Sequence, residues 1–227
     1  MIDSEHVQPA DAEPQDLATR VEALRKRPDV FVRESRVFSR GEAFLGDIES
    51  ALGFRNEHLR RLKELGVNIP DNEMVGIDES GERPMAIESS ARVMGDELDL
   101  ALVNHDPKVT SADLNTHYSG LLAYMKETYE KGGFFLSDIT RNNQQSMLGH
   151  TITDLEDKIY LIDLEPVMEA FHPQEIDHAN NTHYFRSLDL LQHSVEFAGR
   201  FGQDIEEVLA EVKTFRHSIP ESIHTGD

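Results

Sequence analysis

The sequence predicts an α+β fold, with short strands concentrated in the N-terminal part and helices dominating the C-terminal part. Apolar residues recur at helical spacing in several long stretches, and short runs rich in β-branched and aromatic residues lie between them. The two kinds of element are grouped along the chain and do not alternate regularly. Of the 227 residues, 38% are hydrophobic, which is enough to form a core.

The first predicted elements follow a polar N-terminal segment. Residues 1–15 combine acidic residues with two prolines, and we expect them to form a flexible acidic tail. A helix is predicted over 16–27, where Leu17, Val21 and Leu24 share one face, and Pro28 requires that helix to end. Residues 30–38 are rich in valine and phenylalanine, which predicts a strand.

The next predicted elements are helical and then extended. Residues 41–65 should be mostly helical, with one helix ending near Gly53 and a second one following it. Gly66 lies where the C-terminal cap of the second helix is expected. Strands are predicted over 73–78 and 85–88, and the glycine-containing turn between them is typical of a β-hairpin.

The chain beyond this hairpin is predicted to be largely helical. A helix over 114–129 carries an apolar stripe and ends at the glycine pair 132–133. A short apolar run, 134–136, leads into a polar loop, and 158–164 is the most convincing buried strand of the chain. We expect these two runs to pair as a hairpin.

The remainder of the chain contains two further predicted helices and no predicted strand. After Pro166, helices are expected over 184–201 and 204–216, where apolar residues again follow helical spacing.

The charge of the chain limits the partners that it can bind. It has 22 basic and 43 acidic residues, which gives a formal net charge of −21. A surface of this sign repels nucleic-acid phosphates and anionic membranes, so neither is an expected partner. The chain has no cysteine, which excludes disulfides, zinc–thiolate sites and thiol nucleophiles.

The cellular location of the protein is inferred from the segments that its sequence lacks. No apolar run approaches the roughly 20 residues of a membrane-spanning helix. The acidic N-terminal segment has no apolar stretch of the kind found in secretory signals. We therefore expect a cytoplasmic protein, although export as an effector by another route or a saline habitat would account for the acidity equally well.

The clearest chemical pattern lies between residues 134 and 163. An apolar run delivers Asp138 to a loop, Asn143 follows five residues later, and Asp163 ends a second apolar run. Carboxylate and amide oxygens suit Mg²⁺, and a carboxylate that does not bind the metal can orient a hydroxyl and accept its proton. Phosphoryl transfer requires this combination of groups.

At these residues the sequence resembles the protein-kinase-like phosphotransferase superfamily. The spacing D-x-x-x-x-N of that family's catalytic loop is matched by Asp138 and Asn143, and its metal-binding aspartate is matched by Asp163. The local sequence IDLE looks more like the branch of aminoglycoside phosphotransferases and lipopolysaccharide kinases than like the DFG motif. The resemblance extends over about residues 30–170.

The resemblance implies a two-lobed fold with a nucleotide in the cleft. Residues 16–90 would form a small N-terminal lobe, with strands and a helix similar to the family's helix C. Residues 91–227 would form a mostly helical C-terminal lobe that carries the catalytic loop. The implied cofactors are ATP and Mg²⁺, with Asp138 as the catalytic base and Asn143 and Asp163 on the metal. The acceptor would be a hydroxyl on a protein or a small molecule.

The resemblance also implies residues that hold the nucleotide. Arg33 or Arg36 would contact the phosphates in place of the family's lysine, and Glu57 is preferred over Glu49 as the helical acid that steadies it. A solvated strand face for the two arginines and an ordinary helix ion pair for Glu57 are the competing interpretations. Four residues would form the hinge whose backbone contacts adenine: Glu88, Ser89, Ser90 and Ala91.

Two other functions are compatible with the sequence. The chain shows neither the glycine-rich phosphate loop nor the strand lysine of the family, which favours a pseudokinase that binds or regulates without catalysis. A helical interaction protein without a nucleotide site is the third alternative, and it predicts that 134–136 and 158–164 do not pair. His172, His178 and His183 lie near Asp177, but their spacing fits no helical ligand pair, so we interpret them as surface residues.

Overall fold

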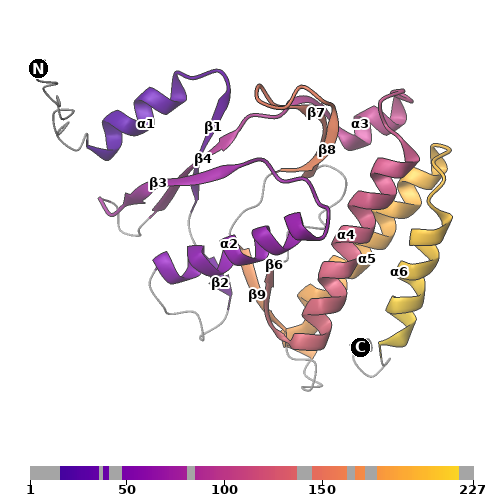
Figure 1. Ribbon diagram of the computed structural model, residues 1–227. Helices are drawn as coiled ribbons and strands as arrows, with labels where there is room; N and C mark the ends of the chain where they lie inside the picture. Colours follow the sequence, from indigo (N-terminus) through magenta and orange to yellow (C-terminus); the bar gives the residue numbers. More distant parts are fainter. Residues whose placement is uncertain are drawn as a thin grey trace, which may run out of the picture.

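The structure is a computed structural model of the whole chain. It describes residues 16–35, 38–40, 48–80, 85–136, 145–162, 167–171 and 178–219. Within these ranges helices and small, mainly antiparallel sheets are combined, which confirms the α+β class. Figure 1 shows a sheet with one helix at one end of the molecule and a group of long helices at the other.

The N-terminal sheet has three antiparallel strands in the order β1-β4-β3. They are β1 (Val30–Ser35), β3 (Asn72–Asp78) and β4 (Met85–Ala91), which confirms all three strands predicted here. Helix α1 (Leu17–Arg25) packs on this sheet. Val21 of α1 meets Val75 and Ile87 of the sheet in a small separate hydrophobic cluster.

Helix α2 (Ile48–Glu64) is a single helix, so the predicted break near Gly53 is wrong. A glycine inside a helix costs about 1 kcal/mol, and the burial of Leu52, Leu59 and Leu62 on the same helix offsets that cost. The predicted end at Gly66 is confirmed. Gly66 has φ 89°, its N–H donates to the carbonyl of Lys63, and the N–H of Val67 donates to the carbonyl of Leu62, 3.1 Å away.

The long helices form the largest body of the molecule. They are α4 (Ser111–Lys131), α5 (His178–Arg200) and α6 (Glu206–Ser218), which lie side by side in Figure 1 and contact one another. The shorter α3 (Leu98–Val103) precedes them. Together with α2 they bury the main hydrophobic core, in which Leu62, Leu114, Tyr118 and Val212 are at most 1% exposed.

Two further sheets connect the helices to the N-terminal sheet. One is antiparallel, in the order β5-β7-β8, with β5 (Met94–Glu97), β7 (Ser146–His150) and β8 (Lys158–Leu161). The other has the order β2-β9-β6, with β2 (Phe38–Arg40), β6 (Gly133–Leu136) and β9 (Val167–Phe171).

Two sequence predictions about these strands are wrong. The two apolar runs do not form a hairpin with each other, because β6 pairs with β9 and β8 pairs with β7. The absence of this pairing is the outcome that the alternative of a helical interaction protein predicted. The chain after Pro166 is not wholly helical, because β9 is the central strand of its sheet. Its parallel neighbour β2 is more than a hundred residues away in sequence, and no local pattern reports such a distant partner.

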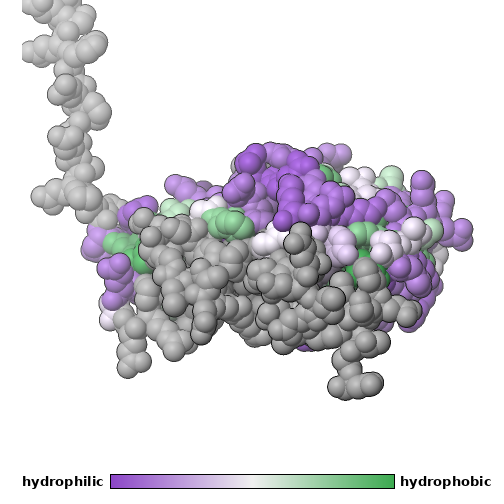
Figure 2. All heavy atoms as spheres, turned by 90° about the horizontal axis from the view of Figure 1, so that it is seen from below, coloured by the Kyte–Doolittle hydropathy of each residue, from purple (hydrophilic) through white to green (hydrophobic). Residues whose placement is uncertain are grey.

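The described residues on the face seen from below in Figure 2 are mostly hydrophilic. The view from below in Figure 2 shows hydrophobic residues only in small, separate patches. The two hydrophobic clusters do not follow the division expected at residue 90, because α2 contributes to the larger one. These clusters do not test the predicted division of the chain into two lobes near residue 90, so the division stays a prediction.

Candidate functional site

A cavity of about 410 Å³ lies between the N-terminal sheet and the sheet that contains β7 and β8. Strands β1 and β4 form one wall, and Met147, Leu161 and Ile162 form the opposite one. Arg55 and Leu59 of α2 close a third side. A volume of this size is typical of small-molecule sites.

The chain between α2 and β3 joins these walls. Asn68 makes a parallel bridge with Tyr160, and the N–H of Leu161 donates to the carbonyl of Asn68 at 2.8 Å. Ile69 and Pro70, the next two residues, line the cavity. The segment that leads into the N-terminal sheet is therefore tied to the edge of β8.

A buried ion pair forms part of the cavity wall. Arg55 and Glu88 both line the cavity, although only 2% and 7% of their side chains are exposed. The guanidinium donates through Nη1 to Oε2 of Glu88 at 2.5 Å and through Nη2 to Oε1, and Nη2 also donates to Asn56 at 3.1 Å. This two-pronged geometry fixes the plane of the guanidinium.

The remaining charged groups lie nearer to solvent. Arg92 and Glu97 line the cavity and are exposed, whereas Arg33 is half-buried. Arg33 lies opposite Glu88 in the β1–β4 register. The cavity is therefore lined by a buried ion pair that neutralises itself and by three other charged side chains that are more exposed to solvent.

The predicted hinge residues Glu88, Ser89, Ser90 and Ala91 all line this cavity. Their backbone, however, belongs to the interior of β4, which pairs with β1 on one side and β3 on the other. The N–H of Ala91 donates to Asp71 at 2.9 Å. The N–H of Arg92 likewise donates to the carbonyl of Asp29 at 2.9 Å, so the backbone hydrogen bonding of the sheet extends through Arg92. The predicted hinge role of these residues stays a prediction.

The other predicted residues fall in different places. Arg33 lines the cavity, and its predicted role in contacting a nucleotide stays a prediction. Glu57 is exposed and does not line it, but lies at a second cavity on the other side of α2. Asp138, Asn143, Asp163 and Arg36 lie outside the described residues, so their assigned roles stay predictions.

The described residues next to the predicted metal ligands are close together. Ile162, which directly precedes Asp163, donates its N–H to the carbonyl of Gln145 at 2.7 Å. Gln145 follows Asn143 by two residues, and Ile162 lines the cavity. The described residues nearest in sequence to Asn143 and Asp163 are therefore hydrogen-bonded to each other, and one of them, Ile162, lies at the cavity.

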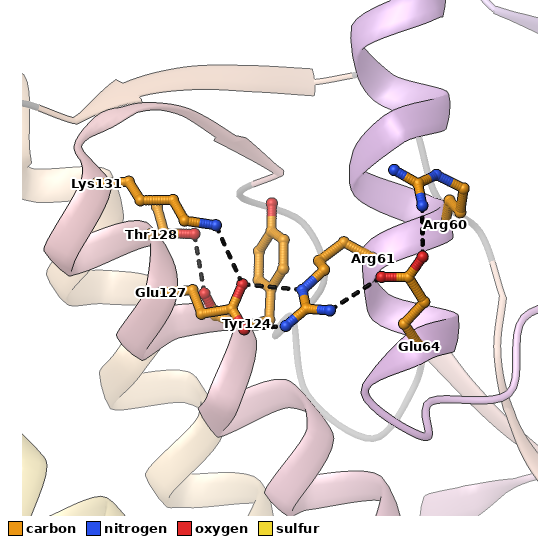
Figure 3. A network of polar contacts seen from close by, with 7 residues as sticks. All are labelled: Arg60, Arg61, Glu64, Tyr124, Glu127, Thr128 and Lys131. Carbon is orange, nitrogen blue, oxygen red and sulfur yellow. Dashed lines mark hydrogen bonds and ion pairs between the residues drawn. The ribbon is translucent and has the colours of Figure 1, made fainter.

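The second cavity, of about 370 Å³, lies between α2 and the C-terminal half of α4. Figure 3 shows its polar network, in which the Arg61 guanidinium lies between two carboxylates. Arg61 donates through Nε to Glu127 at 2.9 Å and through Nη1 to Glu64 at 2.9 Å. These hydrogen bonds raise the pKa of Arg61, and the bond from Arg61 lowers the pKa of the Glu127 carboxyl.

A buried tyrosine links this cavity to the chain that leads towards Asp138. The Tyr124 hydroxyl accepts a hydrogen bond from the N–H of Leu136 at 3.0 Å and lies 2.6 Å from Nδ1 of His58. Burial raises the pKa of Tyr124 and lowers the pKa of His58. Tyr124 thus connects α2, α4 and the end of β6.

Arg55 is the cavity residue that the sequence prediction missed. It lies at helical spacing from Leu52, Leu59 and Leu62, which are all buried. A lone arginine inside an otherwise apolar stripe was the available signal, because a charged residue there needs a buried partner.

Among the described residues, no group of three or more histidine, cysteine, aspartate or glutamate side chains could hold a metal ion. The side chains of His172, Asp177, His178 and His183 are outside that part of the structure, so their surface location stays a prediction. In the described helices, none has the length and apolar character required to cross a bilayer. No protein-family model and no curated protein matches the chain.

Proposed function

We propose that the protein is a kinase-like phosphotransferase that transfers the γ-phosphoryl group of ATP, with Mg²⁺, to a hydroxyl acceptor. The observation that carries the proposal is the hydrogen bond from Ile162 to Gln145 at the cavity wall, because it joins the two segments that contain Asn143 and Asp163. Oxygen ligands from two such segments suit Mg²⁺.

The order of elements supports a two-lobed, kinase-like arrangement. A three-stranded sheet with α2 comes first, α4 then precedes β6, and the β7–β8 hairpin ends just before Asp163. The cavity lies between the first sheet and this hairpin. The proposed lobes would meet there. Adenine would lie against the side of β4 that lines the cavity and against the Arg92–Val93 segment.

The proposed chemistry divides the work among three residues. Asp138 orients the acceptor hydroxyl and takes its proton as the oxygen forms a bond to the γ-phosphorus. The bond between that phosphorus and the bridging oxygen breaks, and ADP leaves. Asn143 and Asp163 hold the ion that balances charge on the phosphates, and positioning supplies most of the rate enhancement.

Labelled ATP tests this proposal directly. The protein is incubated with γ-labelled ATP, Mg²⁺ and cell lysate, and label is followed in protein and in small molecules. We expect Mg²⁺-dependent transfer that Asp163→Ala abolishes while the thermal melt stays cooperative. Asp204→Ala is the matched control, because Asp204 is exposed in the turn before α6 and does not line the cavity. Full activity of Asp163→Ala would reject the assignment.

A binding or regulatory module without catalysis is the second candidate. It is favoured by the absence of lysine among the described residues that line the cavity. A thermal-shift assay with ATP separates the two. Stabilisation that requires Mg²⁺ favours the enzyme, whereas stabilisation by ATP alone, without transfer of label, favours the module.

A further inference from the structure

Arg55, which lines the cavity, has a buried hydrogen-bond donor that no described residue accepts. Its Nη1 and Nη2 atoms donate to Glu88 and Asn56. Its Nε atom is buried and has no hydrogen-bond partner in the described part of the chain. Buried donors without a partner are rare in folded proteins, and each calls for an explanation.

The surroundings of Arg55 limit what this donor can bind. The residue lines the cavity, and hydrogen bonds to both oxygens of Glu88 hold its guanidinium in one orientation. A fixed guanidinium donor suits an anionic oxygen, because a charge-assisted hydrogen bond is stronger than a neutral one. Because the guanidinium is already held in one orientation, binding a ligand would cost little additional side-chain entropy.

The described residues that line the cavity include slightly more basic than acidic side chains. Among the described residues, three arginines line it, Arg33, Arg55 and Arg92, together with the two acids Glu88 and Glu97. This small positive excess occurs in a chain with a net charge of −21. The described lining is therefore less acidic than the chain as a whole, which makes it less repulsive to phosphates than the rest of the described surface.

We propose that Arg55, held by Glu88, is the residue that contacts a phosphate of the bound nucleotide. The inference rests on the proposed function and specifies the phosphate end of that same site. In this inference Arg55 of α2 contacts the phosphate, the role that the sequence analysis gave to Arg33 or Arg36. Glu88 of β4 steadies Arg55, the role that the sequence analysis gave to Glu57. The helix thus supplies the cation and the strand supplies the acid.

The test compares three probes on two variants. Binding of Mg²⁺–ATP, inorganic triphosphate and adenosine is measured by calorimetry on the full chain. Arg55→Lys keeps a positive charge next to Glu88 but removes the Nε donor and the planar fork. Arg61→Lys is the matched control, because Arg61 lies on the same helix and faces the second cavity.

We expect Arg55→Lys to weaken Mg²⁺–ATP and triphosphate by about tenfold or more, the effect of one charge-assisted hydrogen bond, and to leave adenosine unchanged. Arg61→Lys should bind all three probes as the wild type does. Unchanged affinity of Arg55→Lys for triphosphate would overturn the inference, and so would an equal loss of adenosine.

A second variant covers the case in which Arg55→Lys does not fold. The double substitution Arg55→Met with Glu88→Met replaces the ion pair by apolar side chains of similar length, a change that folded proteins often tolerate. Triphosphate affinity should be lost in it, and retention would contradict the inference.

Failure of the inference and failure of the proposed function are distinguishable. If Arg55-dependent binding occurs without transfer of label, the inference stands and the phosphotransferase proposal fails. If label is transferred while Arg55→Lys binds normally, the reverse holds. If the wild type binds none of the probes, both are rejected.

Discussion

Helix α2 carries two arginine–carboxylate pairs with similar geometry and opposite surroundings. Arg55 pairs with Glu88 of β4, and their side chains are 2% and 7% exposed. Arg61 pairs with Glu127 of α4, and theirs are 40% and 26% exposed. In each pair the arginine donates to both carboxylate oxygens.

The difference in solvent exposure decides what each pair does. Water can solvate Arg61 or Glu127 when its partner is removed, so the loss of the pair has a small effect. Arg55 and Glu88 have no such alternative, and removing one leaves a buried charge without a partner. The inner pair therefore ties the helix to the N-terminal sheet, whereas the outer pair joins α2 to α4 nearer the surface.

The largest expected effect comes from breaking the inner pair. Glu88→Ala should lower the free energy of unfolding by about 3–5 kcal/mol, because it leaves the Arg55 guanidinium buried and unpaired. Chemical denaturation measures the change. Glu127→Ala is the exposed counterpart, and an equal loss in the two variants would show that burial does not separate them.

The second effect concerns His117, a buried histidine of α4. Its Nε2 lies 3.1 Å from the Ser146 hydroxyl, its Nδ1 has no partner among the described residues, and burial lowers its pKa to about 4. The unfolded chain takes up this proton below the ordinary pKa of 6.5, whereas the folded protein does so only near 4. Stability should therefore fall as the pH drops through this window, by about 3 kcal/mol in total from this group.

Denaturation at several pH values checks this prediction on the wild type and on His117→Leu. The variant should lose the part of the pH dependence that comes from His117. His58, whose pKa burial also lowers, contributes in the same direction and remains in the variant. Parallel profiles for the two proteins would contradict the assignment.

A smaller effect is expected at Tyr124, which is buried but makes neutral hydrogen bonds. Tyr124→Phe removes the acceptor of the Leu136 N–H and the partner of His58. Stability should fall by about 2 kcal/mol, as is usual when a buried donor loses its partner. Hydrogen exchange of the Leu136 amide should become faster than that of Phe135, whereas unchanged protection would indicate that the hydroxyl does not hold this segment.

The smallest effect is expected at the outer pair. Arg61→Ala should lower the melting temperature less than Glu88→Ala or Tyr124→Phe, because both partners of the outer pair are solvated. Added salt should reduce even this difference, since ions screen exposed charges. A salt-independent loss as large as that of Glu88→Ala would remove the contrast between the two pairs.

The sequence predicted the elements whose signals are local. The helix that ends at Gly66 and the strands of the N-terminal sheet follow from spacing, capping and turn residues within a few positions. Gly53 misled the prediction, because a local penalty of about 1 kcal/mol is smaller than the contribution of the buried leucines on either side of it.

The candidate site also contains some residues that the sequence predicted and others that it did not. Glu88 to Ala91 and Arg33 were predicted to contact a nucleotide, and they line the cavity. Arg55 was not predicted, because its importance depends on a carboxylate 33 residues away. Asp138, Asn143 and Asp163 remain predictions of the sequence, with hydrogen-bonded neighbours of the last two already in contact.

By itself the sequence determined the acidic character, the α+β class and the position of most helices, because charge and periodicity are properties of neighbouring residues. Only the tertiary structure decided that β6 pairs with β9, that α2 runs unbroken and that Arg55 meets Glu88. These features depend on which distant surfaces exclude water together, and burial of that kind is cooperative and leaves no local pattern.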